Sequence, residues 1–221
     1  MKKFIFVVFL LLPNSGFANE LDHIVQAIEA EWASIYFSTE IRDKENAYTR
    51  LLNKTTEFAK QTHESPELMF WQATIIASRA EHQNPIDALA AIHKAQDLLI
   101  KTIKIKPDTL DGSALITLGS LYHQAPGWPI AFGDDKKAEQ YLKEGLQINP
   151  RGIESNFYYG QYLLNKDQPE EAIEYFKTAL NGPIRKEQEF ADSSLKEKIK
   201  NIMIKTATTE SKSRKKQIAS L

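Results

Sequence analysis

A 34-residue repeat in the second half of the chain restricts its fold more than any other feature. A repeating pair of helices cannot bury its outer face alone, so consecutive pairs must stack against one another. Three pairs of positions recur at this period: Ala138 with Ala172, Leu142 with Phe176, and Gly145 with Ala179. The sequence therefore predicts an all-α fold in which antiparallel helix pairs form a solenoid.

The unit at residues 153–186 follows the pattern of the tetratricopeptide repeat, which also has a period of 34 residues. Gly160 and Ala172 stand where that pattern requires small side chains, because two helices approach closely there. Phe176 stands where a large side chain fills the gap to the next pair, and Pro183 follows near the end of the unit. These matches predict two antiparallel helices.

The preceding unit has the same pattern with one interruption. Gly119 and Tyr122 match its first helix, and Ala138 matches its second. Sixteen positions lead from Tyr122 to Ala138 where the repeat has nine, so seven residues are inserted between the two helices. The inserted region contains PGWPIAFGDD at positions 126–135.

This inserted loop is predicted to be stiff, because proline fixes its φ angle and glycine accepts backbone angles that other residues resist. Asp134 directly precedes the next predicted helix and is expected to cap it, since a carboxylate there accepts backbone N–H groups. Asp135 is then the freer charge. For Trp128 and Phe132 two hypotheses stay open: the rings fill a gap between helices that the loop holds apart, or they rim a binding groove.

Apolar residues at helical spacing predict further helices on both sides of the two clear units. The predicted segments are residues 21–37, 45–61, 66–82, 85–105 and 186–205. The last of them is expected to cover the apolar end of the stack, as capping helices do in solenoids. Residues 206–221 are polar and basic and are predicted to form a disordered tail.

The first eighteen residues have the layout of a secretory signal peptide. Two lysines precede nine apolar residues, Phe4 to Leu12, and Gly16-Phe17-Ala18 supplies small residues for cleavage after Ala18. Nine apolar residues are too few for a membrane anchor, since a spanning helix needs about 20. We therefore expect a helical domain over residues 19–205, located in the periplasm or secreted, with no stable membrane anchor after cleavage.

Composition and motifs supply no constellation of residues for catalysis. The chain has no cysteine, which excludes disulfides, thiol catalysis and a lipid-modified cysteine. Its five histidines never pair at three- or four-residue spacing, and no nucleophile elbow or phosphate-binding glycine loop is present. The formal net charge of −1 gives no bulk attraction to nucleic acid. We therefore predict a protein that is not an enzyme, with no cofactor, no metal and no nucleic-acid partner.

Further motifs accompany the repeat: Leu110-Asp111-Gly112-Ser113, Leu118-Gly119 with Tyr122, Pro126-Gly127-Trp128-Pro129-Ile130, Phe132-Gly133-Asp134-Asp135, Asn149-Pro150 with Gly152-Ile153, and Tyr158-Tyr159-Gly160. Through them the chain resembles bacterial exported tetratricopeptide-repeat proteins. More narrowly, it resembles the TatT-like periplasmic components associated with TRAP (tripartite ATP-independent periplasmic) transporters, over residues 25–205. The resemblance implies a right-handed solenoid with a central pore or cleft that binds a protein or a small apolar or anionic ligand.

The resemblance also implies a binding face, because in such stacks the first helix of each pair turns positions 2, 5, 9 and 12 toward the ligand. Those positions are Glu154, Phe157, Gln161 and Leu164 in one unit, and Ser113, Ile116, Ser120 and His123 in the unit before it. The candidate binding residues are Ile116, His123, Trp128, Phe132, Asp135, Phe157 and Gln161. This mixed face suits an extended peptide or an amphipathic small molecule.

Two functions follow from these expectations. The first is a non-catalytic exported scaffold that binds a protein or peptide partner, such as a transporter's solute-binding subunit, through its concave face. The alternative is a periplasmic accessory component that binds a small molecule for a TRAP-type solute transporter. The shape of the site separates them, because a closed cavity of a few hundred Å³ favours a small ligand and an open strip favours a peptide.

Overall fold

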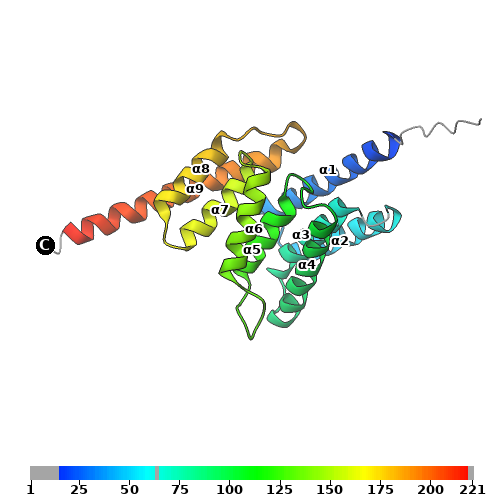
Figure 1. Ribbon diagram of the computed structural model, residues 1–221, viewed down its shortest axis with the longest axis horizontal. Coiled ribbons are helices and arrows are strands. Elements are labelled where there is room, and N and C mark those ends of the chain that lie inside the picture. The colour runs from blue at the N-terminus through cyan, green and yellow to red at the C-terminus, as the bar shows by residue number, and fades with distance from the viewer. Residues whose placement is uncertain (1–14, 63–64, 219–221) are drawn as a thin grey trace, which may run out of the picture.

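The computed structural model describes residues 15–62 and 65–218, with side chains over 20–62 and 65–208. Within these ranges every regular element is a helix, which confirms the predicted all-α class. The two terminal helices extend toward opposite ends of the molecule (Figure 1). The helices are α1 (Ser15–Phe37), α2 (Lys44–Gln61), α3 (Pro66–Ala80), α4 (Pro85–Ile105), α5 (Ser113–Gln124), α6 (Asp135–Ile148), α7 (Ile153–Asn165), α8 (Pro169–Asn181), the short 3-10 helix η1 (Lys186–Gln188) and α9 (Glu189–Ile218).

Local sequence signals determine where several of these helices begin. Four side chains accept hydrogen bonds from backbone N–H groups in the first turn of α2, α3, α4 and α6: Asp43, Ser65, Asn84 and Asp134. A proline stands at the start of α3, α4 and α8, where its missing N–H would have had no helical partner. The helix predicted over 85–105 coincides with α4, and the helices predicted over 21–37, 45–61 and 66–82 differ from the observed ones only near their ends.

Consecutive helices pack in pairs, α3 with α4, α5 with α6 and α7 with α8, and neighbouring pairs contact each other. Two glycines mark close approaches within these pairs. A Cβ atom on Gly119 of α5 would lie 2.8 Å from Leu142 Cγ of α6, and one on Gly160 of α7 would lie 2.7 Å from Phe176 Cε1 of α8. Leu142 and Phe176 are 34 positions apart. The same glycine-to-large contact therefore recurs at the period seen in the sequence.

The last helix contacts both ends of the array. α9 packs against α7 and α8, as a capping helix does, and it also packs against α1. The rings of Phe37 and Phe190 have centroids 6.4 Å apart, and Lys198 Nζ donates a hydrogen bond to Tyr36 Oη at 2.9 Å. Helices from opposite ends of the chain therefore meet and enclose the space that lies between the pairs.

The polar C-terminal segment corrects one expectation, because α9 continues to Ile218 through most of residues 206–221. No proline or glycine follows Pro183, so no residue in this segment breaks a helix. Residues 1–14, most of the predicted signal peptide, lie outside the described residues. Across 15–62 and 65–218, none of the helices combines the length and the apolar character needed to cross a membrane.

Candidate ligand-binding cavity

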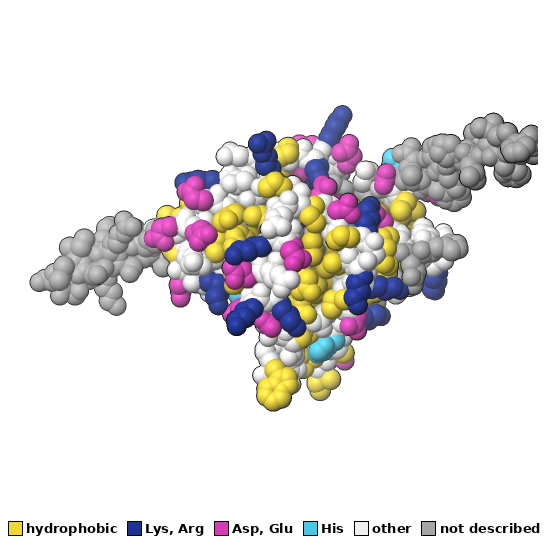
Figure 2. Space-filling view, viewed as in Figure 1, with side chains coloured by type: hydrophobic (Ala, Val, Ile, Leu, Met, Phe, Trp, Pro, Cys, Tyr) yellow, Lys and Arg dark blue, Asp and Glu magenta, His cyan; other side chains and the backbone are white. Residues whose placement is uncertain are grey.

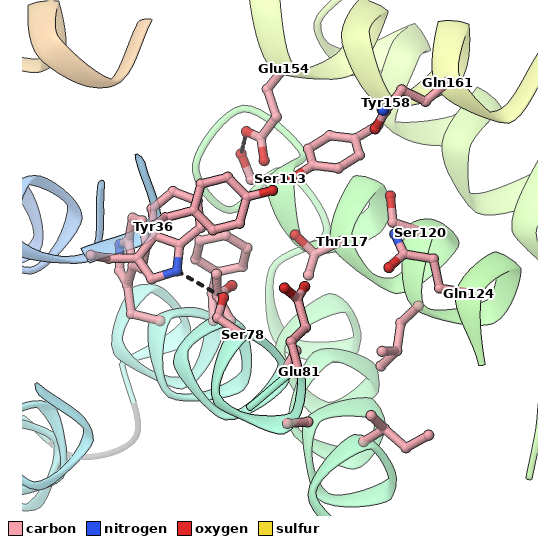
Figure 3. A pocket seen from close by; sticks show the side chains of 18 of the residues that line it. Tyr36, Ser78, Glu81, Ser113, Thr117, Ser120, Gln124, Glu154, Tyr158 and Gln161 are labelled. Carbon is pink, nitrogen blue, oxygen red and sulfur yellow. Dashed lines mark hydrogen bonds between the residues drawn. The ribbon is translucent and has the colours of Figure 1, made fainter. Parts of the chain in front are cut away.

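A cavity of about 780 Å³ lies between α1, α3, α4, α5, α7 and α9. Figure 3 looks into it and shows side chains of α1 and α3 facing side chains of α5 and α7 across the open space. Six helices from the whole length of the chain contribute to its wall, so no single helix pair could form it. Its lining has an aromatic wall, an uncharged polar wall and a charged end.

The aromatic wall comes from α1 and α3. The Trp32 and Tyr36 rings stack with centroids 4.9 Å apart, and Trp32 lies 5.7 Å from Trp71, which in turn contacts Phe70 at 5.2 Å. Trp32 Nε1 donates to Ser78 Oγ at 2.9 Å, which fixes the indole against α3. Interlocked rings lose little conformational freedom when a ligand packs on them, so this wall is a preformed apolar surface.

The polar wall comes from α5 and α7. Thr117, Ser120 and Gln124 follow one face of α5 at spacings of three and four residues, and Tyr158 and Gln161 follow the corresponding face of α7. Figure 3 shows these side chains turned toward the same space. Hydroxyl and amide groups both donate and accept hydrogen bonds, so this wall can orient polar groups of a ligand without adding charge.

The charged end joins α1, α7 and α9. One Arg185 Nη atom lies 2.9 Å from Glu29 Oε1 and 2.7 Å from Asp192 Oδ1. Glu154 lies near this cluster, and its Oε2 accepts a hydrogen bond from Ser113 Oγ at 2.8 Å. The Arg185 guanidinium thus forms ion pairs with two carboxylates, those of Glu29 and Asp192, and the carboxyl group of Glu154 lies nearby.

Burial changes the protonation of these carboxyl groups. It raises the pKa of Glu29 to about 7, because Arg185 opposes the effect only partly and Glu154 and Asp192 add to it. Burial also raises the pKa of Glu154, against the hydrogen bond from Ser113 and the charge of Arg185. Near neutral pH this end therefore carries less negative charge than its three carboxyl groups would have in water.

Two charged side chains reach the middle of the cavity. Glu81 follows the last turn of α3, and Figure 3 shows its carboxylate directed into the space between Tyr36 and Thr117. Within the described residues no hydrogen bond or ion pair holds this carboxylate. Lys198, in contrast, is fixed against Tyr36. Its Nζ donates a hydrogen bond to Tyr36 Oη and lies 5.0 Å from the centroid of the Tyr36 ring.

Of the residues that the resemblance turns toward a ligand, two on each of α5 and α7 line the cavity, and the other two do not. On α7, Glu154 and Gln161 line the cavity, but Phe157 is fully buried in the core and Tyr158 takes its place. On α5, Ser113 and Ser120 line the cavity, Ile116 is buried, and Thr117 and Gln124 occupy the lining positions expected for Ile116 and His123. One residue rotates a side chain by about 100° around a helix, which is enough to move it from wall to core.

The inserted loop separates its two aromatic residues. Phe132 packs against Tyr122 and His93, with ring centroids 5.4 Å and 5.0 Å away. It therefore packs in the gap between α4 and α5, a different pair of helices from α5 and α6, which the loop joins. Trp128 is 89% exposed and lies neither in that gap nor among the residues that line the cavity.

Backbone hydrogen bonds hold this loop in place. Gly133 N donates to Pro126 O at 2.9 Å, and Asp134 N donates to Tyr122 O at 3.0 Å. A side chain at Gly133 would collide with the backbone of Ala125 and Pro126 on the opposite side of the loop, so glycine is required there. Pro126 and Ile130 reach the edge of the cavity. The loop is therefore a fixed part of the cavity rim, although its tryptophan points elsewhere.

The two acidic residues after the loop have different roles. Asp134 caps α6 as predicted, since its carboxylate accepts from two backbone N–H groups. Asp135 is not a free charge, because its oxygens lie 2.8 Å from Lys166 Nζ and 3.0 Å from His123 Nδ1. The hydrogen bond from Lys166, followed by that from His123, lowers the pKa of Asp135. His123 also lies 3.1 Å from Asn165 Nδ2, so these residues link α5, α6 and α7 beside the cavity.

Sequence patterns did not identify the aromatic wall as part of a site. Trp32, Tyr36 and Trp71 recur at helical spacing, which is also how core residues recur. The available signal was the polar stripe on α3, where Ser78 and Glu81 follow an apolar face at helical spacing. A polar stripe on a mostly buried helix indicates that the helix borders water or a ligand.

Neither metal ligation nor similarity to known proteins identifies the chemistry of this site. Across residues 20–62 and 65–208, no cluster of three acidic or histidine side chains is arranged to hold a metal ion. No protein-family model matches the chain, and a search of curated proteins gives no significant match. The geometry of the cavity is therefore what indicates its function.

Proposed function

We propose that this protein is a non-catalytic binding protein that holds a small organic molecule in the cavity. The observation that carries the proposal is the volume of about 780 Å³, within the roughly 300–1,000 Å³ of typical ligand pockets. Aromatic surface with a few polar groups is also the usual lining of such pockets. The contact between α1 and α9 closes one side, which favours a small ligand over an extended peptide. The geometry thus supports the alternative function better than the peptide scaffold.

We further infer that the helix pairs form a right-handed solenoid of the tetratricopeptide type. The support is the pair-by-pair packing and the two glycine contacts at Gly119 and Gly160, whose large partners are 34 residues apart. The predicted signal peptide and the resemblance to TRAP-associated components support a location in the periplasm. There it would bind a solute as an accessory component of a transporter.

A protein partner is the second candidate, and the exposed loop favours it. Trp128 is 89% and Ile130 is 64% exposed on a loop that hydrogen bonds make stiff. Figure 2 shows hydrophobic side chains protruding at the lower end of the molecule, where Figure 1 places the loop between α5 and α6. An exposed aromatic side chain on a stiff loop is a typical anchor for a protein contact. A transporter subunit docked there would lie beside the cavity rim.

Native mass spectrometry of the protein purified from its own cells tests the cavity proposal. We expect a one-to-one adduct of small mass that is lost on denaturation. The variant Ser120→Trp fills the cavity and should lose the adduct, while its circular dichroism melt stays close to that of the wild type. Ser193→Trp places the same side chain on an exposed position of α9 and should keep the adduct.

Two other results would contradict the cavity proposal. If the purified protein carries no small molecule but retains a protein partner that Trp128→Ala releases, the cavity proposal is wrong and the scaffold function replaces it. If Ser120→Trp keeps the adduct, the molecule binds outside the cavity.

A further inference from the structure

The charges that line the cavity are unbalanced. Four of the lining side chains are carboxylates and two are cations: Glu29, Glu81, Glu154, Asp192, Arg185 and Lys198. Arg185 is already engaged by Glu29 and Asp192, and Lys198 is held against Tyr36. Because burial raises the pKa of Glu29 and Glu154, these two groups carry less negative charge near neutral pH, and Glu81 is the carboxylate that faces the open part of the cavity. An ammonium group beside Glu81 would meet an opposite charge, whereas an anionic group there would meet a like charge.

Glu81 is the carboxylate most available to such a ligand. Its side chain points into the open part of the cavity, across from Thr117 and Tyr158 (Figure 3). Within the described residues it has no hydrogen bond and no ion pair, in contrast to Glu29, Asp192 and Glu154. A carboxylate in a partly enclosed space is stabilised by an opposite charge nearby.

The aromatic wall independently favours a cation. Ring faces attract ammonium groups, and the cavity already contains one example, since Lys198 Nζ lies 5.0 Å from the Tyr36 ring centroid. Trp71 lines the same wall, with its ring centroid 5.7 Å from that of Trp32.

We propose that the ligand is a small organic amine, with an ammonium group that pairs with Glu81 and an aromatic or aliphatic body that packs on Trp32, Tyr36 and Trp71. This assignment rests on the proposed function, since it names the class of molecule that the cavity takes. It differs from the apolar or anionic ligand that the resemblance implies.

Three probes that share one ring and one phenolic oxygen test the charge: tyramine, neutral tyrosol and anionic 4-hydroxyphenylacetate. By isothermal titration calorimetry at pH 7.5, we expect tyramine to bind at least about tenfold tighter than tyrosol and the anion to bind weakest. Glu81→Gln keeps the size of the side chain and should remove most of the advantage of tyramine over tyrosol. Glu171→Gln removes a carboxylate from the exposed surface of α8 and should change neither affinity.

The outcomes separate the two proposals. Tyrosol or the anion binding as tightly as tyramine would overturn the amine assignment while the cavity remains a ligand site. No binding by any probe, together with no adduct in native mass spectrometry, would overturn the proposed function itself. Nα-acetyl-lysine amide carries the same ammonium on a peptide unit. If it binds tighter than tyramine, a peptide side chain is the occupant and the small-molecule assignment is wrong.

Discussion

The cavity and the inserted loop are both rich in aromatic side chains, but these side chains differ in how they are packed. In the cavity, Trp32 and Trp71 are packed against other rings, and Trp32 also bonds Ser78. In the loop, only Phe132 is packed, and Trp128 stands 89% exposed. The difference teaches that an aromatic-rich stretch becomes a pocket wall only where several helices converge on it.

The two regions also depend on contacts of different range. The loop is held by backbone hydrogen bonds between residues near each other in sequence, such as Gly133 to Pro126. The cavity depends on α1 meeting α9 and the segment before it, through Glu29 with Arg185 and Tyr36 with Lys198. Breaking these contacts should therefore weaken the packing of all the helices, and perturbing the tip of the loop should not.

The largest effect should be a pH dependence of stability that belongs to Glu29. Its carboxyl group has an ordinary pKa of 4.5 and a folded-state pKa of about 7, so the folded state binds this proton more tightly than the unfolded state. The free energy of unfolding should therefore fall as pH rises from 4.5 to 7, by at most about 3 kcal/mol from this group. Urea unfolding of wild type and Glu29→Gln across pH 5–8 measures it. If wild type and Glu29→Gln differ in free energy of unfolding by the same amount at every pH, the raised pKa of Glu29 is contradicted.

Arg185→Gln should have the next largest effect, because it leaves Glu29 and Asp192 without their shared cation. Both carboxylates are mostly buried, but Arg185 is half exposed, so we expect a loss of about 2–3 kcal/mol rather than the 3–5 of a fully buried pair. Urea unfolding at pH 7.5 measures the loss. Lys177→Gln breaks an exposed ion pair with Glu174 and should cost less than about 0.5 kcal/mol. If Arg185→Gln and Lys177→Gln lower the free energy of unfolding equally, the charged end of the cavity does not hold the terminal helices together.

Phe132→Ala tests the packed half of the loop. The ring contacts Tyr122 and His93 but is only partly buried, so we expect a loss of about 2 kcal/mol, below the 3–5 typical of a core phenylalanine. Thermal or urea unfolding measures it. Phe132→Leu should recover about half of the loss, because it restores apolar volume. A negligible effect of Phe132→Ala would show that the loop, and not this ring, separates the helices.

Trp128→Ala should have the smallest effect on stability, less than about 0.5 kcal/mol, because an 89% exposed side chain gives up little burial on mutation. It should leave ligand binding in the cavity unchanged and weaken only the capture of a protein partner, measured by pull-down from the native envelope fraction. A loss of several kcal/mol would instead show that the indole is packed in solution.

The sequence predicted the helices well because the signals for them are local. Proline at the start of α4 and the capping carboxylate of Asp134 act within one turn, and the glycine contact at Gly160 follows from the repeat pattern. The binding face was harder to predict. The repeat pattern pointed to α5 and α7, which both line the cavity, but the lining residue on α7 is Tyr158 and not its neighbour Phe157, which is buried in the core.

By itself the sequence determined the all-α class, the positions of most helices, the inserted loop and the cap at Asp134, because each depends on residues within a few turns of one another. Only the tertiary structure decided that α9 reaches α1 and closes a cavity. The contact between Tyr36 and Lys198 spans 162 positions, and it depends on how every intervening helix packs against its neighbours. No local sequence pattern encodes the combined result of these packings. For the same reason, no pattern along the chain distinguishes Trp71, which borders the cavity, from a tryptophan of the core.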